Sequence, residues 1–227
     1  MTGICNLTEG DEVARRPRGQ LRQDILDTVI KLLIDTGDVD SVSIDAVVDR
    51  VGCTPPALYY YFPTKTDLLR QACQAEFAKL ARHIEASIAG VPGGSIARLE
   101  GRAYGLLHWA REHPALYRIL FMGPGRPELT RDDVGEDPSL KAIRDNLDAA
   151  IAEGLIHPQD TGLLTLTLWG IGHGYASLAV SFPKIPVASL EAALDMAAGA
   201  IGRAMLTDAG MAASTKVGAS GAVRSLG

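Results

Sequence analysis

Apolar side chains recur at every third or fourth position along most of this chain of 227 residues. Ile25, Val29 and Leu33 show the spacing before Gly37 interrupts it, and a longer stripe runs over residues 69–88. This spacing places apolar side chains on one face of a helix, and glycine commonly ends helices. No stretch alternates apolar and polar residues for long enough to form a strand. The sequence therefore predicts an all-α protein.

Composition and charge exclude several classes of protein. The chain is 47% hydrophobic and 22% charged, which is typical of a folded protein. We expect no apolar run to reach the ~18 residues of a membrane span and no secretory signal at the start, and therefore no membrane partner and a cytoplasmic location. Cys5, Cys53 and Cys73 form no spaced framework, which agrees with a reducing compartment. The net charge of -5 argues against a protein that coats nucleic acid, although a local basic footprint stays possible.

The clearest break in the chain is Gly90–Gly94, where glycine and proline interrupt the helical pattern. We expect a flexible basic arm over residues 1–19 and a helix-turn-helix domain over 20–89. A larger helical domain for ligand binding and dimerisation is expected over 95–207, and a disordered tail over 208–227.

Three closely spaced helix starts lie between residues 43 and 65. Ser43 can cap the helix that opens at Ile44, and Thr54 can cap a helix whose first residue is proline. Thr64 and Asp67 fit a capping box. Only a four-residue turn containing glycine separates the first two helices, so the pattern predicts a helix-turn-helix.

The second of these helices is an unusual core element. Leu58 and Phe62 can face inward, but three consecutive tyrosines cannot all lie on one face. Small apolar residues suit thymine methyl groups, and hydroxyls suit phosphate oxygens, so we predict contacts to DNA. A packed aromatic cluster with its hydroxyls in water is the alternative. The predicted contacts in and around this helix are Thr54, Pro55, Pro56, Ala57, Tyr59 and Tyr61.

Basic residues upstream could add phosphate contacts. Arg15, Arg16 and Arg18 lie in a Gly- and Pro-containing segment that can enter a minor groove or neutralise phosphates. A solvated tail is the alternative. Residues 1–85 carry 10 Lys and Arg against 13 Asp and Glu. Positive charge must therefore be placed at the DNA surface, because it is not abundant.

The stretch from Leu21 to Leu69 resembles the TetR family of transcriptional regulators. The tract LYYYFPTKTDLL at residues 58–69 is similar to the most specific signature of that family. The resemblance implies a homodimeric repressor of double-stranded operator DNA, with Pro55, Pro56, Ala57, Tyr59 and Tyr61 facing DNA and with Ser43 and Lys65 on phosphates. Ala57 departs from the family pattern, in which many members carry a hydroxyl residue, so van der Waals contact is expected there.

A weaker resemblance extends into the second domain, through Trp169, His173 and Gly174, which resemble a Trp–His–Gly class of C-terminal domain. Small residues recur along the apolar segments at about 159–182 and 187–207. Helices that are apolar on more than one side need more than one partner. The same two helices of a second copy are the economical partner, and packing within one monomer is the alternative.

Aromatic and histidine residues of the second domain could line a cavity for an unidentified apolar small molecule. Core packing explains each of them equally well. The candidate lining residues are Tyr104, His108, Trp109, Phe121, Trp169 and His173.

Other kinds of chemistry fit less well. His108 and His113 are five residues apart and do not share a helix face, so no metal site is expected, and no phosphate loop or other cofactor motif is present. Two alternatives from other classes stay open. One is an all-α enzyme that uses His173 as a base, and the other is a thiol-based redox sensor that uses Cys53, which sits in the turn before the DNA-contacting helix.

Overall fold

The computed structural model describes residues 19–89, 94–122 and 138–220, with side chains to residue 214. These residues are almost entirely helical, and they include no strand beyond an isolated bridge between Ile156 and Leu206, which confirms the all-α prediction. The helices are α1 (Gln20–Thr36), α2 (Ile44–Val51), α3 (Pro55–Tyr61), α4 (Lys65–Ile88), α5 (Gly94–Glu112), α6 (Pro114–Tyr117), the π-helix η1 (Arg118–Met122), α8 (Pro138–Ala152), α9 (Thr161–Ser181), α10 (Val187–Met205) and α11 (Asp208–Ser220).

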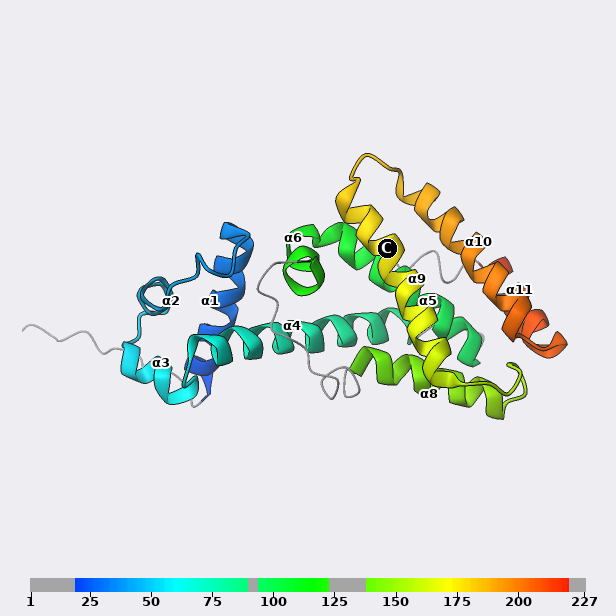
Figure 1. Cartoon of the computed structure of the whole chain (residues 1–227), viewed down its shortest axis with the longest axis horizontal. Helices are drawn as coiled ribbons and strands as arrows, with labels where there is room; N and C mark the ends of the chain where they lie inside the picture. The colour runs from blue at the N-terminus through cyan, green and yellow to red at the C-terminus, as the bar shows by residue number, and fades with distance from the viewer. Residues whose placement is uncertain (1–18, 90–93, 123–137, 221–227) are drawn as a thin grey trace, which may run out of the picture.

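Two groups of helices lie at opposite ends of the long axis of the molecule (Figure 1). The N-terminal domain consists of α1, α2, α3 and the start of α4, which enclose one apolar core around Ile25, Leu58 and Phe62. The C-terminal domain consists of α5 to α11 and the later part of α4. The basic arm that we predict over residues 1–19 lies almost entirely outside the described residues, and so do residues 90–93 of the predicted domain boundary.

Helix α4 belongs to both domains. Leu68, Leu69 and Ala72 at its start are buried in the N-terminal core. Leu80 and Ile84, three turns further on, are buried in a second core with residues of α5, α6 and α9. One continuous helix of 24 residues therefore carries side chains of two separate cores.

The centre of the C-terminal domain is α5, which packs against α4, α8 and α9. A Cβ atom built on Gly172 of α9 would lie 3.8 Å from Ala103 Cα of α5. Such a short separation explains why α9 carries small residues on the face toward α5, where Gly172, Ala176 and Ala179 are buried.

The prediction of a disordered tail over 208–227 is wrong for its first thirteen residues, which form α11. Thr207 fixes the start of this helix, because its N–H donates to Leu155 O over 3.0 Å and its Oγ1 accepts from Gly210 N over 3.2 Å. Ser214 Oγ then donates to Glu100 Oε1 over 2.7 Å. Small polar residues suggested disorder, but tertiary contacts to α5 and to the chain before α9 order the segment.

Helix α9 is long and apolar enough to cross a membrane by length and composition. The expectation that no run in the chain reaches that length is therefore wrong, because 161–181 contains no charged residue. Thr165, Gly172, Ala176, Ala179 and Val180 of α9 are buried against neighbouring helices, and 28% of its apolar window is buried in all.

Candidate functional site

The turn between α2 and α3 has the geometry that the sequence predicts. Ser43 Oγ accepts from Ala46 N over 3.1 Å, and Thr54 Oγ1 accepts from Ala57 N over 3.4 Å. Gly52 takes a left-handed conformation with φ 68°, and its N–H donates to Val48 O over 2.8 Å. Glycine adopts this conformation without the strain that a Cβ atom would cause. The three elements form a helix-turn-helix.

The exposed face of α3 consists of Pro55, Pro56, Tyr59 and Tyr60. Each proline lies three or four residues from a tyrosine, which places the four side chains on one side of the helix, away from the fully buried Leu58. Tyr59 is 45% exposed and Tyr60 is 82% exposed. Tyr60 is absent from the DNA contacts that we predict from the sequence. Only the three-dimensional structure shows that its side chain is exposed and available for such a contact.

Two predicted contacts of α3 lie at the edge of this face. Tyr61 is partly buried against the N-terminal core, and its ring meets the ring of Tyr60 edge to face with centroids 5.1 Å apart. Ala57 is also partly buried. The prediction for Tyr61 assumed that only Leu58 and Phe62 of this seven-residue helix are buried. In the structure, the core of the domain also covers part of Tyr61.

Basic side chains near the exposed face of α3 donate to uncharged oxygens. Lys65 Nζ lies 3.4 Å from Asp40 O, and Arg22 Nη2 lies 2.6 Å from Gln71 Oε1. The guanidinium of Arg22 also lies over the ring of Phe62, at 5.5 Å from its centroid. By contrast, Arg50 and Arg70 pair with carboxylates of Asp35 and Asp67 respectively. Arg15, Arg16 and Arg18 lie outside the described residues.

A cavity of about 350 Å³ opens between the helices of the C-terminal domain. Four of the six predicted ligand residues line it, namely Tyr104, Phe121, Trp169 and His173. They come from α5, η1 and α9, and apolar residues of α4, α8 and α10 complete the wall. The volume lies in the range of pockets that hold small organic ligands.

The predictions for His108 and Trp109 are wrong with respect to the cavity, because neither residue lines it. Trp109 is only 5% exposed and belongs to the core that joins α4, α5 and α6. His108 Nε2 lies 3.0 Å from Glu191 Oε1 at the packing surface of α5 and α10. Trp109 follows Tyr104 by five residues, so rotation along α5 turns it away from the cavity. His108 follows by four residues and shares the face of Tyr104, but one turn further along it pairs with Glu191 of α10.

Aromatic rings surround His173 at one end of the cavity. The ring centroids of Trp169 and Phe121 lie 4.2 Å and 4.4 Å from that of His173. The hydroxyl of Tyr117 lies 3.1 Å from His173 Nδ1 and 3.1 Å from its carbonyl oxygen. Burial raises the pKa of Tyr117 to about 12, so this hydroxyl stays protonated and can donate to the carbonyl.

Charged residues of the cavity wall were missed by the sequence reasoning. Glu85 of α4, Glu100 and Arg102 of α5 and Asp195 of α10 all line it. Glu100 precedes Tyr104 by four residues and so shares its helix face, a spacing that could have shown it. Asp195 gives no such sign, because only the packing of α10 over α5 brings it to Tyr104, whose hydroxyl donates to it.

A helix-turn-helix joined by one helix to a second helical domain is the architecture of a DNA-binding transcriptional regulator. The profile "Bacterial regulatory proteins, tetR family" matches residues 25–72, and the profile "Tetracyclin repressor-like, C-terminal domain" matches residues 99–201. The chain belongs to the TetR family of transcriptional regulators. Its members regulate transcription and are not enzymes, so the alternative of an enzyme that uses His173 is wrong.

Solved structures of this family share the fold at low sequence identity. A TetR-family regulator from Shewanella sp. PV-4 is 22% identical, with 82% of this chain and 98% of that chain covered and a TM-score of 0.63. A regulator from Mesorhizobium loti is 18% identical, with 85% and 100% covered and a TM-score of 0.67. FadR from Bacillus subtilis, solved in complex with stearoyl-CoA, is 15% identical, with 76% and 94% covered and a TM-score of 0.62.

Among curated proteins, the nucleoid occlusion factor SlmA of Haemophilus influenzae is 26% identical over 117 residues. The match covers 52% of this chain and 53% of SlmA, so the chain spans about half the length of that relative.

Proposed function

We propose that this regulator is a homodimeric repressor that an apolar small molecule releases from a palindromic operator. The observation that carries the proposal is that α4 contributes Leu68 and Leu69 to the core behind the helix-turn-helix and Leu80 and Ile84 to the wall of the cavity. A molecule in the cavity therefore touches the helix that supports the DNA-contacting domain. The protein would act where its operator lies, in the cytoplasm.

DNA contacts are proposed on the exposed face of α3 and on the residues that flank it. Pro55, Pro56 and Ala57 would meet base methyl groups, and the hydroxyls of Tyr59, Tyr60 and Tyr61 would reach phosphates. Ser43, Thr54 and Lys65 would add phosphate contacts. The Oγ atoms of Ser43 and Thr54 accept backbone N–H groups, so each hydroxyl keeps its own hydrogen to donate. Arg15, Arg16 and Arg18 are proposed as phosphate or minor-groove contacts.

The dimer interface is proposed on α9 and α10. Their outer faces expose large apolar side chains, and Gly170 and Gly174 on α9 have no heavy atom within 4 Å of a built Cβ. Glycines with open space beside them allow a second backbone to approach closely, and burial of the apolar side chains would stabilise the pair. The exposed apolar residues are Leu163, Leu166, Leu178, Phe182 and Met196.

Release of DNA requires only that the ligand prefers one arrangement of the dimer. A ligand that favours a spacing of the two α3 helices unlike that of the operator half-sites shifts the population away from DNA. A tenfold loss of operator affinity corresponds to about 1.4 kcal/mol of differential binding. Operator DNA must then weaken ligand binding by the same factor.

An unbiased selection of DNA sites bound by the full chain tests the proposal. We expect an inverted repeat, because a two-fold dimer presents two identical α3 helices. Light scattering of the same sample should give twice the chain mass of 24.0 kDa. Recovery of no enriched sequence would contradict the role of α3, and a mass of one chain would contradict the dimer.

A matched pair of variants tests the effector step. Ala142 on α8 lines the cavity, so Ala142→Trp should fill it and give a repressor that stays on its operator in the presence of a compound that releases the wild type. Asp148→Trp places the same side chain at an exposed position of α8 that does not line the cavity, and it should respond like the wild type. Release of both variants alike would place the effector elsewhere.

A further inference from the structure

The cavity is elongated along α5. Its wall includes residues of α5 from Ile96 to Leu106, and ten residues of helix advance about 15 Å. At one end, Leu106 belongs to the core against which Phe121 packs. At the other end, Ile96 belongs to a separate core that contains Met205 and Leu206. An unbranched molecule that lies along α5 would therefore reach from one core of the domain to the other.

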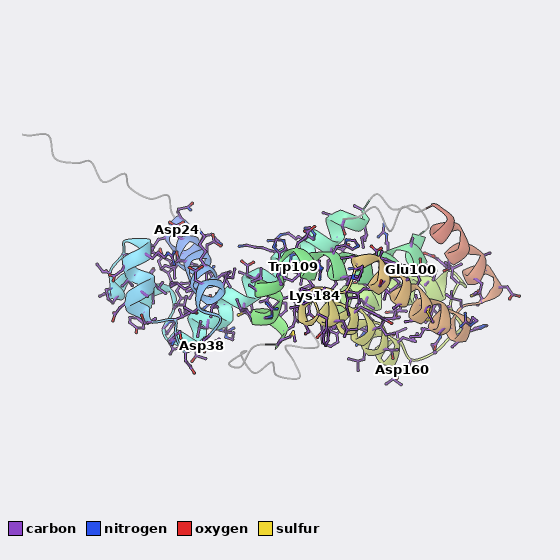
Figure 2. The ribbon with its side chains drawn as sticks, turned by 90° about the horizontal axis from the view of Figure 1, so that it is seen from above. Asp24, Asp38, Glu100, Trp109, Asp160 and Lys184 are labelled. Carbon is purple, nitrogen blue, oxygen red and sulfur yellow. The ribbon has the colours of Figure 1, made fainter. Side chains whose placement is uncertain are left out.

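Helix α11 lies at the end of the C-terminal domain that is farther from the N-terminal domain (Figure 1). Figure 2 shows that α5 runs in the same direction, with Glu100 farther from the N-terminal domain than Trp109. Met211 and Ser214 are the described side chains of α11 that line the cavity. Met211 is 38% exposed and α11 is the outermost helix there, so little else stands between this end of the cavity and solvent.

Contacts to two other segments hold α11 in this place. Thr207 N donates to Leu155 O over 3.0 Å, in the turn between α8 and α9. A Cβ atom built on Gly210 would collide with Leu155 O, so glycine is what lets the helix lie so close to that turn. One turn further along, Ser214 Oγ donates to Glu100 Oε1 of α5 over 2.7 Å. The helix is therefore fixed at its start and again beside the cavity.

We propose that α11 is the end wall of the effector cavity and that Met211 limits the length of the apolar chain that the cavity accepts. This inference rests on the proposed function, whose effector it assigns to the class of unbranched apolar molecules. An extended chain advances about 1.2 Å per bond, so a length of about 15 Å holds about twelve bonds. A longer chain must bend or push α11 away from Leu155 and Glu100.

A series of unbranched primary alcohols with six to fourteen carbons tests the limit. Each alcohol is titrated into the full chain below its solubility, and binding is measured by calorimetry. Affinity should rise about fourfold for each methylene up to about twelve carbons, because each buried methylene adds hydrophobic free energy. The alcohol with fourteen carbons should bind more weakly than the one with twelve. A rise that continues by the same factor to fourteen carbons, or no binding of any alcohol, would overturn the proposal.

A matched pair of variants tests the role of Met211. Met211→Ala removes the side chain at the end of the cavity, so the alcohol with fourteen carbons should now bind more tightly than the one with twelve. Binding of the six-carbon alcohol should stay unchanged. Met196→Ala makes the same truncation at a side chain of α10 that is 77% exposed and does not line the cavity, and it should keep the wild-type limit.

A third variant moves α11 without changing the cavity wall. Gly210 does not line the cavity, but the added Cβ atom of Gly210→Ala must push α11 away from Leu155. The limit at about twelve carbons should therefore disappear in this variant as well. If Met211→Ala and Gly210→Ala both keep the wild-type limit, another helix closes the cavity and the proposal is wrong.

Two readouts separate this inference from the proposed function. Operator binding in the absence of any alcohol should be the same for the three variants and the wild type, which also shows that the variants fold. Failure of the wild type to bind DNA would contradict the regulator, while the length limit could still be measured. The absence of a limit in a protein that binds its operator would contradict only the role of α11.

Discussion

The two domains of this regulator are specified in different ways. In the N-terminal domain, α2, α3 and α4 each begin at a side-chain cap, supplied by Ser43, Thr54 and Thr64. In the C-terminal domain, α9 begins at the side-chain cap of Asp160, but α6 and α10 begin without one. Local signals therefore determine all three helix starts from Ser43 to Thr64, whereas they determine only part of the second domain.

Exposure shows the same contrast. The core of the N-terminal domain fully buries Leu58 and Phe62, and what it leaves exposed on α3 is largely aromatic hydroxyls and proline rings. The C-terminal domain leaves Leu163, Leu166 and Met196 more than half exposed and encloses a cavity. One domain is closed on itself with a surface suited to DNA, and the other retains surfaces suited to a second copy and to a ligand.

Phe62→Ala should have the largest effect, because it should unfold the N-terminal domain and leave the C-terminal domain folded. Phe62 is fully buried, and truncation of such a side chain costs about 3–5 kcal/mol. We expect operator binding to vanish while the emission of Trp109 and Trp169, both in the C-terminal domain, stays native. Ile34→Ala, at a side chain 40% exposed in the same domain, is the control and should retain DNA binding. A simultaneous change of tryptophan emission in Phe62→Ala would mean that the domains unfold together.

Gly174→Arg should disrupt the dimer without unfolding the subunit. The open space around Gly174 lets one chain accept the new side chain, but a second copy could no longer approach. We expect a folded monomer with strongly reduced operator affinity, measured by light scattering and DNA titration. Asp148→Arg introduces the same side chain on exposed α8 and should stay dimeric. If Gly174→Arg remains a dimer, the interface lies on other helices.

The tyrosines of α3 should show a smaller and graded effect. Loss of one phosphate hydrogen bond costs about 1 kcal/mol, so Tyr60→Phe and Tyr59→Phe should each weaken binding to all DNA sequences alike. Tyr61→Phe should cost less than Tyr60→Phe, because its ring is partly buried in the core. Lys65→Ala should lower the slope of binding against salt by about one. If none of these substitutions changes affinity, α3 is not the DNA-contacting helix.

The contrast between the domains explains how far the sequence could be interpreted. The helix-turn-helix followed from capping residues and Gly52, since these signals act within a few residues of the chain. The cavity was predicted in part, because Tyr104, Phe121, Trp169 and His173 line it. Trp109 was misplaced, and Asp195 was missed, because both depend on how α10 and α6 pack on α5. The end of the chain was misjudged for the same reason, since contacts to Leu155 and Glu100 order α11.

Cysteine reactivity should show the smallest effect. Burial raises the pKa of Cys73 to about 11, so about one thiol in a thousand is ionised at pH 8. Iodoacetamide at that pH should leave Cys73 unmodified in the folded chain and modify it after denaturation, as measured by mass spectrometry. Rapid modification of Cys73 in the native protein would show that the core of α4 opens.

Cys53 carries the remaining redox alternative, which stays a prediction to be tested. Its side chain packs partly against the N-terminal core, as a small apolar residue would. We therefore expect Cys53→Ala to bind operator DNA like the wild type, with no difference between reductant and peroxide. A response to peroxide that disappears in Cys53→Ala would favour the redox sensor.

The length of α4 sets how far a small motion is amplified. Its 24 residues span about 36 Å, at 1.5 Å per residue. A tilt of about 10° at the cavity end would carry the other end through about 6 Å, since displacement grows with the length of the lever. The rise along the helix axis from one phosphate of a DNA strand to the next is only about 3.4 Å, so a ligand need shift its immediate contacts only slightly to move α3 out of register with the groove.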